Sequence, residues 1–524
     1  MSASTPRCCT RSAIEDATMN AASTDQQDAF RAAYEAGRGA LVWRVAAADL
    51  TTPVAAFLKL AHGMPHSFLL ESVEGGAARG RYSVIGFAPD LLWRCDDGAV
   101  SINRDAATDV DAFAPDGQAA FDSLRALIAE TRLELPEHLP PMTGGLVGYL
   151  GYDMVRLMER LPALKPDVLD IPDAVLMRPG MFAIFDSVND EITLAAPSYP
   201  RADVSADDAY RAAIARIEAA EAALDRPTPQ MVGSAVPAGA PRSNMTEQQF
   251  KAMVLRGKEY IAAGDVFQVV PSQRFAQPFT LPPFAFYRSL RRINPAPFLF
   301  FLDFGGFQAV GSSPEILVRL RDGTVTIRPL AGTRKRGASR AEDLALETEL
   351  LEDPKERAEH LMLLDLARND VGRVAAIGSV KVTESFAIER FSHVMHISSN
   401  VEGRIRKTAD ALDALIAGFP AGTLSGAPKV RAMEIIEEFE PSRRGLYGGC
   451  IGYFAANGTM DTCIALRTAL IKDETLYVQA GVGVVADSDP DAEYAESLQK
   501  ARALFRAAEE AVHYVSTNAG AVVS

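Results

Sequence analysis

The chain has 524 residues, of which 48% are hydrophobic and 23% are charged. This composition is typical of a large globular protein, and the chain is too long for one small domain. The formal net charge of −15 at pH 7 disfavours proteins that bind nucleic acid or anionic membranes across a broad surface, although it is compatible with a local basic pocket.

Residues 1–25 are rich in Ala, Ser and Thr and lack the apolar core of a secretory signal. We therefore expect a disordered extension, in which Met19 is an alternative start. No later apolar run approaches membrane-spanning length. The five cysteines form no Cys-x-x-Cys pair, which indicates a reducing compartment, by default the cytoplasm, without structural disulfides or zinc.

Apolar strand-like runs alternate with helical runs from residue 26 to an Ala-rich helix that ends before Pro227. Residues 226–245 are rich in Pro, Gly, Ala and Ser, and this composition predicts a mobile linker. The sequence therefore predicts an N-terminal region over 26–225 and a second region over 246–524, two lobes of mixed α and β structure.

The second region begins with two recognisable elements. Thr246 is expected to cap a helix that reaches Ile261, because Gln249 stands at the capping-box position. Residues 266–270 are expected to form a strand, in which Gln268 shares a face with two valines. An amide buried there either makes structural hydrogen bonds or lines a polar cavity, and periodicity leaves both possibilities open.

Two glycine-containing segments, 311–315 and 328–337, flank a strand pair joined by the turn dipeptide Asp322-Gly323. Glycine beside a hydroxyl group lets backbone N–H groups approach an anion, and three basic residues follow at 334–336. A plain turn with a solvated basic patch would have the same sequence. Both interpretations remain open at this point.

The segment Gly422–Lys429 contains glycine, hydroxyl and lysine residues but is not a Walker phosphate loop, because no Ser or Thr follows the lysine. It predicts the start of a helix, with Thr423 or Ser425 near the cap and Pro428 in the first turn. Such a helix start can bind a carboxylate.

His393 and His396 stand in a run that predicts a strand, where residues three apart point to opposite faces. They are therefore a poor chelating pair. One of them could act in acid–base chemistry, although a structural histidine is the commoner case.

Two Glu-x-x-Glu pairs occur in segments that predict helices, Glu356 with Glu359 and Glu493 with Glu496. Residues three apart project from one face of a helix, so each pair offers two carboxylates to one place. Four carboxylates around a shared cleft would need a cation, and Mg²⁺ suits carboxylate and water ligands. Taken alone, such pairs are more often solvated faces.

Eight motifs of the second region resemble, in the same order, those of the chorismate-utilising enzymes. They are Gly311–Glu315, Pro329–Arg334, Glu359–Met362, Asp365–Asp370, His393–His396, Thr423–Pro428, Tyr447–Gly449 and Gln479–Gly483. The resemblance spans nearly everything after the linker. It identifies residues 246–524 as the chorismate-binding catalytic domain. It implies an α+β fold, a two-lobed sandwich of antiparallel β-sheets covered by helices, with the active site in a cleft.

The N-terminal region adds a second resemblance. Leu69–Ser72 and Gly80–Ser83, together with Asn294–Phe298, are similar to the tryptophan-binding motif of the family members that form anthranilate. Ala296 and the pair Phe298-Leu299 depart from the usual Ser and Tyr-Met, which affects the detail of the contact. The resemblance implies a tryptophan inhibitor site made by Glu71, Ser72, Pro297, Phe298 and Leu299.

The resemblance also implies roles for individual residues. Mg²⁺ would be held by Glu359 and Glu496, with Glu356 and Glu493 close by or acting through water. Glu315 would protonate the departing C4 hydroxyl of chorismate, and His396 would assist the loss of pyruvate, with Gln268 and Thr423 completing the catalytic set. Residues expected to bind the substrate carboxylates are Gly332, Thr333, Gly481, Val482 and Gly483 for the ring carboxylate, and Tyr447 and Arg467 for the enolpyruvyl group.

Two positions distinguish members of the family. Isochorismate and salicylate synthases, in which water attacks, have a lysine where this chain has Gln268, and the para-aminating aminodeoxychorismate synthases commonly have a lysine where it has Ala331. The resemblance therefore implies ortho amination to anthranilate in tryptophan biosynthesis. The alternatives are an aminodeoxychorismate synthase component I and an isochorismate or salicylate synthase. In a different class, the alternative is an inert tryptophan-sensing scaffold for an amidotransferase.

The source of ammonia is expected to lie in another chain. No cysteine stands in the Gly-x-Cys-x-Gly setting of glutamine amidotransferases. The resemblance implies a separate glutamine amidotransferase subunit in a hetero-oligomer, and tryptophan as a distant feedback inhibitor.

Overall fold

The computed structural model describes residues 25–74, 78–140, 142–162, 164–233, 239–391 and 394–516. The expected disorder of the N-terminal extension, the middle of the linker and His393 therefore lie outside the described residues. Within the described residues, no helix is long and apolar enough to cross a membrane.

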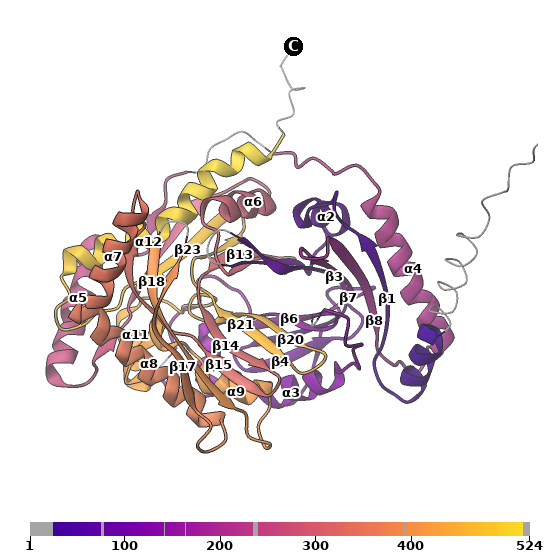
Figure 1. The fold of residues 1–524 in the computed structure, drawn as a ribbon, viewed down its shortest axis with the longest axis horizontal. Coiled ribbons are helices and arrows are strands. Elements are labelled where there is room, and N and C mark those ends of the chain that lie inside the picture. Colours follow the sequence, from indigo (N-terminus) through magenta and orange to yellow (C-terminus); the bar gives the residue numbers. More distant parts are fainter. Residues whose placement is uncertain are drawn as a thin grey trace, which may run out of the picture.

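The described part of the chain contains a single large antiparallel sheet of 21 strands, which Figure 1 shows as two layers. The strands are β1 (Ala40–Ala47), β2 (Ser67–Glu74), β3 (Ala78–Asp96), β4 (Ala99–Asn103), β5 (Ala114–Pro115), β6 (Gly145–Leu150), β7 (Ala174–Asp186), β8 (Glu191–Ser198), β9 (Arg242–Ser243), β11 (Ser272–Pro278), β12 (Phe298–Asp303), β13 (Gln308–Ser313), β14 (Ile316–Arg321), β15 (Thr324–Ile327), β16 (Leu330–Lys335), β17 (Lys381–Arg390), β18 (Val394–Arg404), β20 (Cys450–Ala455), β21 (Met460–Ile464), β22 (Thr468–Lys472) and β23 (Thr475–Gly481). Strands β10 (Gln268–Val269) and β19 (Gly426–Ala427) form a separate pair.

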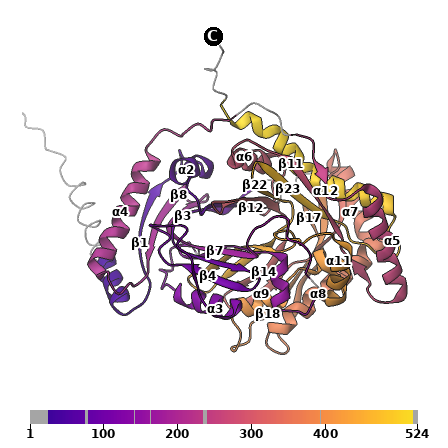
Figure 2. The same cartoon turned by 180° about the vertical axis from the view of Figure 1, so that it is seen from behind.

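Helices cover the outer faces of the sheet, and Figures 1 and 2 agree that α6 and α12 lie over one layer while α8 and α9 lie under the other. The helices are α2 (Pro53–Leu60), α3 (Ala120–Glu130), α4 (Ala206–Leu224), α5 (Glu247–Ala263), α6 (Pro283–Ile293), α7 (Arg340–Glu352), α8 (Pro354–Val374), α9 (Ala411–Gly418), α10 (Gly422–Ser425), α11 (Lys429–Phe439) and α12 (Pro490–Glu510), with 3-10 turns η1 (Tyr152–Leu157) and η2 (Ala511–Tyr514). The predicted α+β sandwich is confirmed.

Strands from the two sides of the predicted linker pair directly with one another at two places in the sheet. Strand β2 pairs with β12, where Glu71 lies opposite Leu299, and β6 pairs with β20, where Leu150 lies opposite Cys450. The two regions defined by the sequence therefore share one sheet and several cores, and the larger of the two cavities described below is lined by residues of both.

Local sequence signals account for several elements. The capping box of α5 is confirmed, because Thr246 Oγ1 accepts from the Gln249 N–H and Gln249 Oε1 accepts from the Thr246 N–H. The hairpin turn at Asp322-Gly323 is also confirmed. Both residues have positive φ, 50° and 69°, as the turn that joins β14 to β15 requires.

Two expectations about local structure are wrong. The strand expected over 266–270 is only two residues long. Its partner is the two-residue strand β19 and not a strand of the large sheet, so only Gln268 and Val269 are paired. The helix expected from Thr423 or Ser425 is divided into α10 and α11, and Pro428 precedes α11 without a side-chain cap. Gly426, with φ 131°, is extended and pairs with Val269, which interrupts the helix.

Candidate active site

Both Glu-x-x-Glu pairs stand in the first turns of long helices. Asp353 caps α8 and Asp489 caps α12, each accepting hydrogen bonds from two backbone N–H groups, and a proline follows each cap. The helical prediction for both segments is confirmed. The positive end of each helix dipole favours carboxylates there, so the local fold concentrates negative charge at two helix starts.

The carboxylates of the two helices affect one another. Burial raises the pKa of Glu359, and the charges of Glu356 and Glu496 raise it further. Burial likewise raises the pKa of Glu493, with a further contribution from Glu496. The acidic residues of α8 and α12 are therefore near enough to influence one another's charge.

Three of the four carboxylates have a polar neighbour, which is a cation for Glu356 and Glu496 and a neutral amide for Glu359. Gln268 Nε2 donates to Glu359 Oε1 at 3.1 Å, and Arg334 Nη1 donates to Glu356 Oε1 at 3.1 Å. Lys500 Nζ lies 2.8 Å from Glu496 Oε1. The sequence left open whether the Gln268 amide makes a structural hydrogen bond or belongs to a polar site. In the structure it does both, because its hydrogen-bond partner is a residue of the candidate site.

A divalent cation suits this set of donors. Among the described residues, no three His, Cys, Asp or Glu side chains are already grouped closely enough to hold a metal. Mg²⁺ keeps several waters and usually takes only one or two protein carboxylates, so Glu359 and Glu496 suffice. The residues fit Mg²⁺, provided that Lys500 and Gln268 yield part of their contacts.

Glu315 lies in the chain between β13 and β14 and is 7% exposed. Burial raises the pKa of its carboxyl group to about 8, against the lowering effect of the Leu330 N–H and the Thr423 hydroxyl. Thr423 Oγ1 is buried and makes no hydrogen bond of regular geometry. Both residues line a cavity of about 30 Å³. At pH 7 Glu315 therefore carries a proton that it can donate.

His396 is held in one tautomer. Its Nδ1 lies 2.9 Å from the carbonyl oxygen of Gly332 and 3.1 Å from Thr333 Oγ1. Because a carbonyl only accepts, Nδ1 carries the proton and Nε2 has a free lone pair. Burial lowers the pKa of the ring to about 4, so His396 is neutral at pH 7 and can accept a proton.

The glycine-rich segment 481–483 lies between Tyr447 and Gln268. A side chain at Gly481 would place its Cβ 2.9 Å from the Tyr447 hydroxyl, and one at Gly483 would place its Cβ 2.6 Å from Gln268 Nε2. At Gly481 the Cβ would also lie 2.8 Å from the Pro271 carbonyl oxygen, so the backbone leaves no room for a side chain there, whereas a side chain at Gly483 would displace the Gln268 amide. Arg467 Nη1 donates to the Lys500 carbonyl at 2.9 Å, which connects it to α12, while Val482 is fully buried.

A larger cavity of about 680 Å³ is lined by all five residues expected to bind tryptophan. Glu71 makes a bidentate ion pair with Arg291, at 2.7 and 2.8 Å, and accepts from Tyr287 at 2.5 Å. Its carboxylate is therefore engaged by the protein, while Ser72 and the segment 297–299 also line the cavity. Pro314 and Ile316 also line this cavity, on either side of Glu315.

The serines of the segment 311–315 do not face a ligand. Ser312 Oγ donates to the Asn294 carbonyl and Ser313 Oγ donates to the Ile464 carbonyl, and both serines are fully buried. Arg334 and Arg336 are paired with acidic residues of α7 and α8. These contacts favour the structural interpretation of the two serine hydroxyl groups, and anion binding by the backbone N–H groups of these segments stays a prediction.

A sequence model described as chorismate binding enzyme matches residues 88–506. The chain belongs to the chorismate-binding enzyme family. It is 60% identical over 486 residues to anthranilate synthase component 1 of Cereibacter sphaeroides, a match that covers 92% of this chain and 97% of that protein. The Pseudomonas aeruginosa protein of the same name is 49% identical, with 88% and 93% covered.

Solved structures of chorismate-binding enzymes agree with this fold. Anthranilate synthase component I from Streptococcus pneumoniae matches with a TM-score of 0.72 at 36% identity, over 81% of this chain and 92% of that chain. The menaquinone-specific isochorismate synthase of Escherichia coli matches with a TM-score of 0.68 at 19% identity, over 90% and 94%, which shows the fold alone. The chain is thus an enzyme of the group whose relatives are named anthranilate synthase component 1.

Sequence reasoning missed Lys500 of this chorismate-binding enzyme. Lys500 Nζ donates to the Gly481 carbonyl at 3.0 Å as well as contacting Glu496, and its charge opposes the raised pKa of Glu359. The signal was present, because Lys500 follows Glu496 by four residues, the spacing of neighbours on a helix face. It links the acidic pair of α12 to the segment 481–483.

Proposed function

We propose that the chain is the large subunit of anthranilate synthase, which converts chorismate and ammonia into anthranilate, pyruvate and water. The observation that carries this proposal is the neutral amide of Gln268, buried and hydrogen-bonded to Glu359. Attack by water requires a base beside the nucleophile, whereas ammonia attacks with its own lone pair. The 60% identity to a named relative supports the same choice.

In the first stage, the nitrogen of ammonia bonds to C2 of chorismate while the C4–O bond breaks. The proton of Glu315 passes to the departing hydroxyl, which leaves as water, and the ring double bonds shift. The buried setting that keeps Glu315 protonated at pH 7 supplies the acid that this step requires. Glu315 is left as a carboxylate, and the nitrogen, which carries a positive charge after the attack, releases one proton, which balances the proton that Glu315 recovers before the next turnover.

In the second stage, the proton at C2 passes to the free Nε2 of His396 as the C3–O bond to the enolpyruvyl group breaks. The ring becomes aromatic, and the released enolpyruvate takes up a proton to give pyruvate. Arg467 and Tyr447 are assigned to the enolpyruvyl carboxylate, since a guanidinium can donate two parallel hydrogen bonds to it.

Mg²⁺ belongs to the proposal, with Glu359 and Glu496 as ligands and Glu356 and Glu493 near it or acting through water. When bound, the ion would neutralise the charge of the ring carboxylate of chorismate, and the backbone of Gly332-Thr333 and of residues 481–483 is assigned to bind that carboxylate. The carboxylate donors at two helix starts support this assignment.

Ammonia is proposed to come from a glutamine amidotransferase subunit, and the complex to be a hetero-oligomer. The designation component 1 of the relatives supports a second component. Three cysteines among the described residues, Cys95, Cys450 and Cys463, are buried and free, which favours the reducing cytoplasm.

The test is direct. Purified protein with chorismate, Mg²⁺ and ammonium is expected to produce anthranilate, measured by its fluorescence, and pyruvate in equal amount. Formation of isochorismate or aminodeoxychorismate instead would contradict the proposed reaction. Absence of any turnover, with tryptophan still bound, would favour an inert sensor of tryptophan.

Tryptophan is proposed to inhibit from the 680 Å³ cavity. Phe298→Ala is expected to raise the tryptophan concentration that gives half inhibition by about 10-fold, because an aromatic contact contributes up to about 1.5 kcal/mol to binding. The measurement is anthranilate formation against tryptophan concentration. A change in chorismate KM with unaltered inhibition would place Phe298 outside the inhibitor site.

A further inference from the structure

A buried ion pair between Arg444 and Glu440 lies beside the candidate active site without containing any residue assigned to it. The side chains are 2% and 4% exposed. Arg444 Nη2 lies 2.6 Å from Glu440 Oε1, and its Nε lies 3.0 Å from Oε2. Burying a charged pair is costly, so its presence calls for an explanation.

The remaining donors of Arg444 bind two separate backbone segments. Nη1 donates to the Leu424 carbonyl at 2.7 Å and Nη2 donates to the Val270 carbonyl at 2.6 Å. Leu424 follows the candidate catalytic residue Thr423, and Val270 stands two residues after Gln268. One guanidinium therefore connects the two segments that carry these side chains.

The same ion pair contacts the part of the site assigned to carboxylates. The guanidinium carbon of Arg444 lies 5.5 Å from the centre of the Tyr447 ring and 4.7 Å from that of Tyr152. Glu440 Oε1 accepts from Ser272 N–H and Oγ at 2.9 and 2.7 Å, and Ser272 pairs with Gly481 across the sheet. Four segments of the candidate site thus meet at one pair.

We propose that Arg444 is a positioning residue, which holds the segments of Gln268, Thr423, Tyr447 and Gly481 in the relative arrangement that chorismate requires. The inference rests on the proposed function. Arginine is needed because its planar fork donates in several fixed directions at once, whereas lysine presents a single nitrogen. Arg444 touches no substrate and acts through the backbone that it binds.

The test must separate positioning from general stability. Arg444→Met alone would leave Glu440 buried and unpaired, so Arg444→Met is combined with Glu440→Gln. This pair of changes removes both charges and leaves an amide oxygen that still accepts from Ser272. Any remaining loss of stability then reflects the missing connections.

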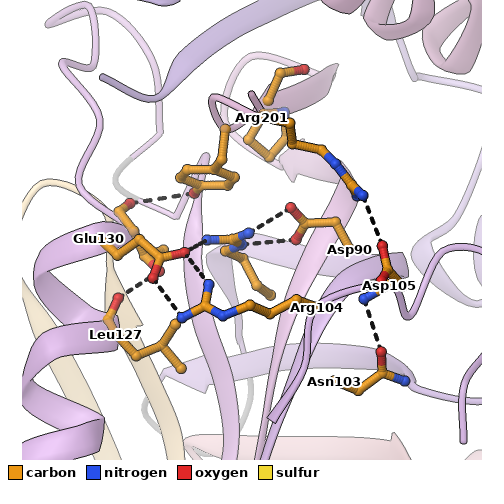
Figure 3. A network of polar contacts seen from close by, with 12 residues as sticks. Asp90, Asn103, Arg104, Asp105, Leu127, Glu130 and Arg201 are labelled. Carbon is orange, nitrogen blue, oxygen red and sulfur yellow. Dashed lines mark hydrogen bonds and ion pairs between the residues drawn. The ribbon is translucent and has the colours of Figure 1, made fainter. Parts of the chain in front are cut away.

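The chain offers a matched control in Arg178, an arginine whose side chain is 6% exposed. Arg178 donates to Asp90 at 2.7 and 2.8 Å and to Glu130 at 3.1 Å, and it stacks on Tyr199. Figure 3 shows this network, in which Glu130 also pairs with Arg104. None of these partners is a candidate site residue, so Arg178→Met with Asp90→Asn removes, away from the site, an ion pair whose arginine is buried to a similar extent and whose aspartate is 34% exposed.

The expected result is a divergence between the two double variants. The control should keep kcat and the chorismate KM within about 2-fold, because ordinary stability losses leave the folded fraction high. The Arg444→Met, Glu440→Gln variant should raise the chorismate KM and lose about 100-fold or more in kcat/KM, since small misplacements have effects of that size. Arg444→Lys should fall between wild type and this variant. Equal kcat/KM in the two double variants would overturn the inference.

Backbone amide hydrogen exchange gives a readout independent of turnover. Exchange should accelerate over residues 268–272, 422–427 and 445–449 in the Arg444→Met, Glu440→Gln variant and stay unchanged there in the control. Unchanged exchange at these segments would also overturn the inference. A wild-type protein that makes no anthranilate would overturn the proposed function alone, and exchange would still decide the role of Arg444.

Discussion

Glu315→Gln is expected to abolish anthranilate formation and at the same time to stabilise the protein. The loss of activity should be about 10²–10⁴-fold, because Gln has no proton to give to the departing C4 hydroxyl. The gain in stability arises because the buried carboxyl group of Glu315 is costly to the fold at neutral pH, where the unfolded chain ionises freely.

The pH dependence has a definite sign. The pKa of Glu315 is about 8 in the folded protein against an ordinary 4.5, so unfolding releases its proton at intermediate pH. This carboxyl group therefore costs nothing below pH 4.5, and stability falls as pH rises from about 4.5 to about 8, by up to about 5 kcal/mol. Glu315→Gln should remove this dependence, so that its melting temperature exceeds that of wild type more at pH 8 than at pH 6.

The measurements are thermal melts at both pH values and kcat at a fixed concentration of un-ionised ammonia. Wild-type activity should decline as pH rises through about 8, when Glu315 loses its proton. Asp303→Asn is the control, because burial also raises the pKa of Asp303 and its contact with Gly305 N–H survives in Asn. Full activity in Glu315→Gln would remove Glu315 from the catalytic role.

Glu359→Gln and Glu496→Gln are expected to weaken Mg²⁺ binding and chorismate turnover together. Each change replaces a charged ligand by a neutral one, and the loss of Mg²⁺ affinity should exceed the 10–100-fold typical of residues that only support a ligand. Glu356→Gln and Glu493→Gln should have smaller effects, about 10-fold, because these residues are assigned to contacts through water.

Mg²⁺ affinity is measured by calorimetry on the protein without substrate, so the result does not depend on turnover. Glu510→Gln, at the end of α12 and paired with Arg506, is the control and should bind Mg²⁺ as the wild type does. Equal Mg²⁺ affinity in Glu359→Gln, Glu496→Gln and the wild type would exclude the proposed ligands.

Elements whose signals are local could be predicted from the sequence. The capping box of α5, the hairpin turn at Asp322-Gly323 and the helical spacing of both acidic pairs depend on residues within a few positions of one another. The order of motifs was sufficient to assign the family. Such features are encoded in short segments, so they can be recognised without knowing which distant segments approach them.

The tertiary structure decided what each side chain does. Gln268 meets Glu359 across 91 residues of sequence, and the two-residue length of β10 follows from its pairing with β19. The hydrogen bonds from Arg444 to the Val270 and Leu424 carbonyls could not be predicted from any motif. The protonation of Glu315 likewise depends on burial by residues from α8 and α10 that line its cavity. The sequence by itself was sufficient to identify which chemical groups are candidates for the site. Their charge states and contacts were determined only by the fold, because hydrogen-bond partners and burial depend on long-range packing.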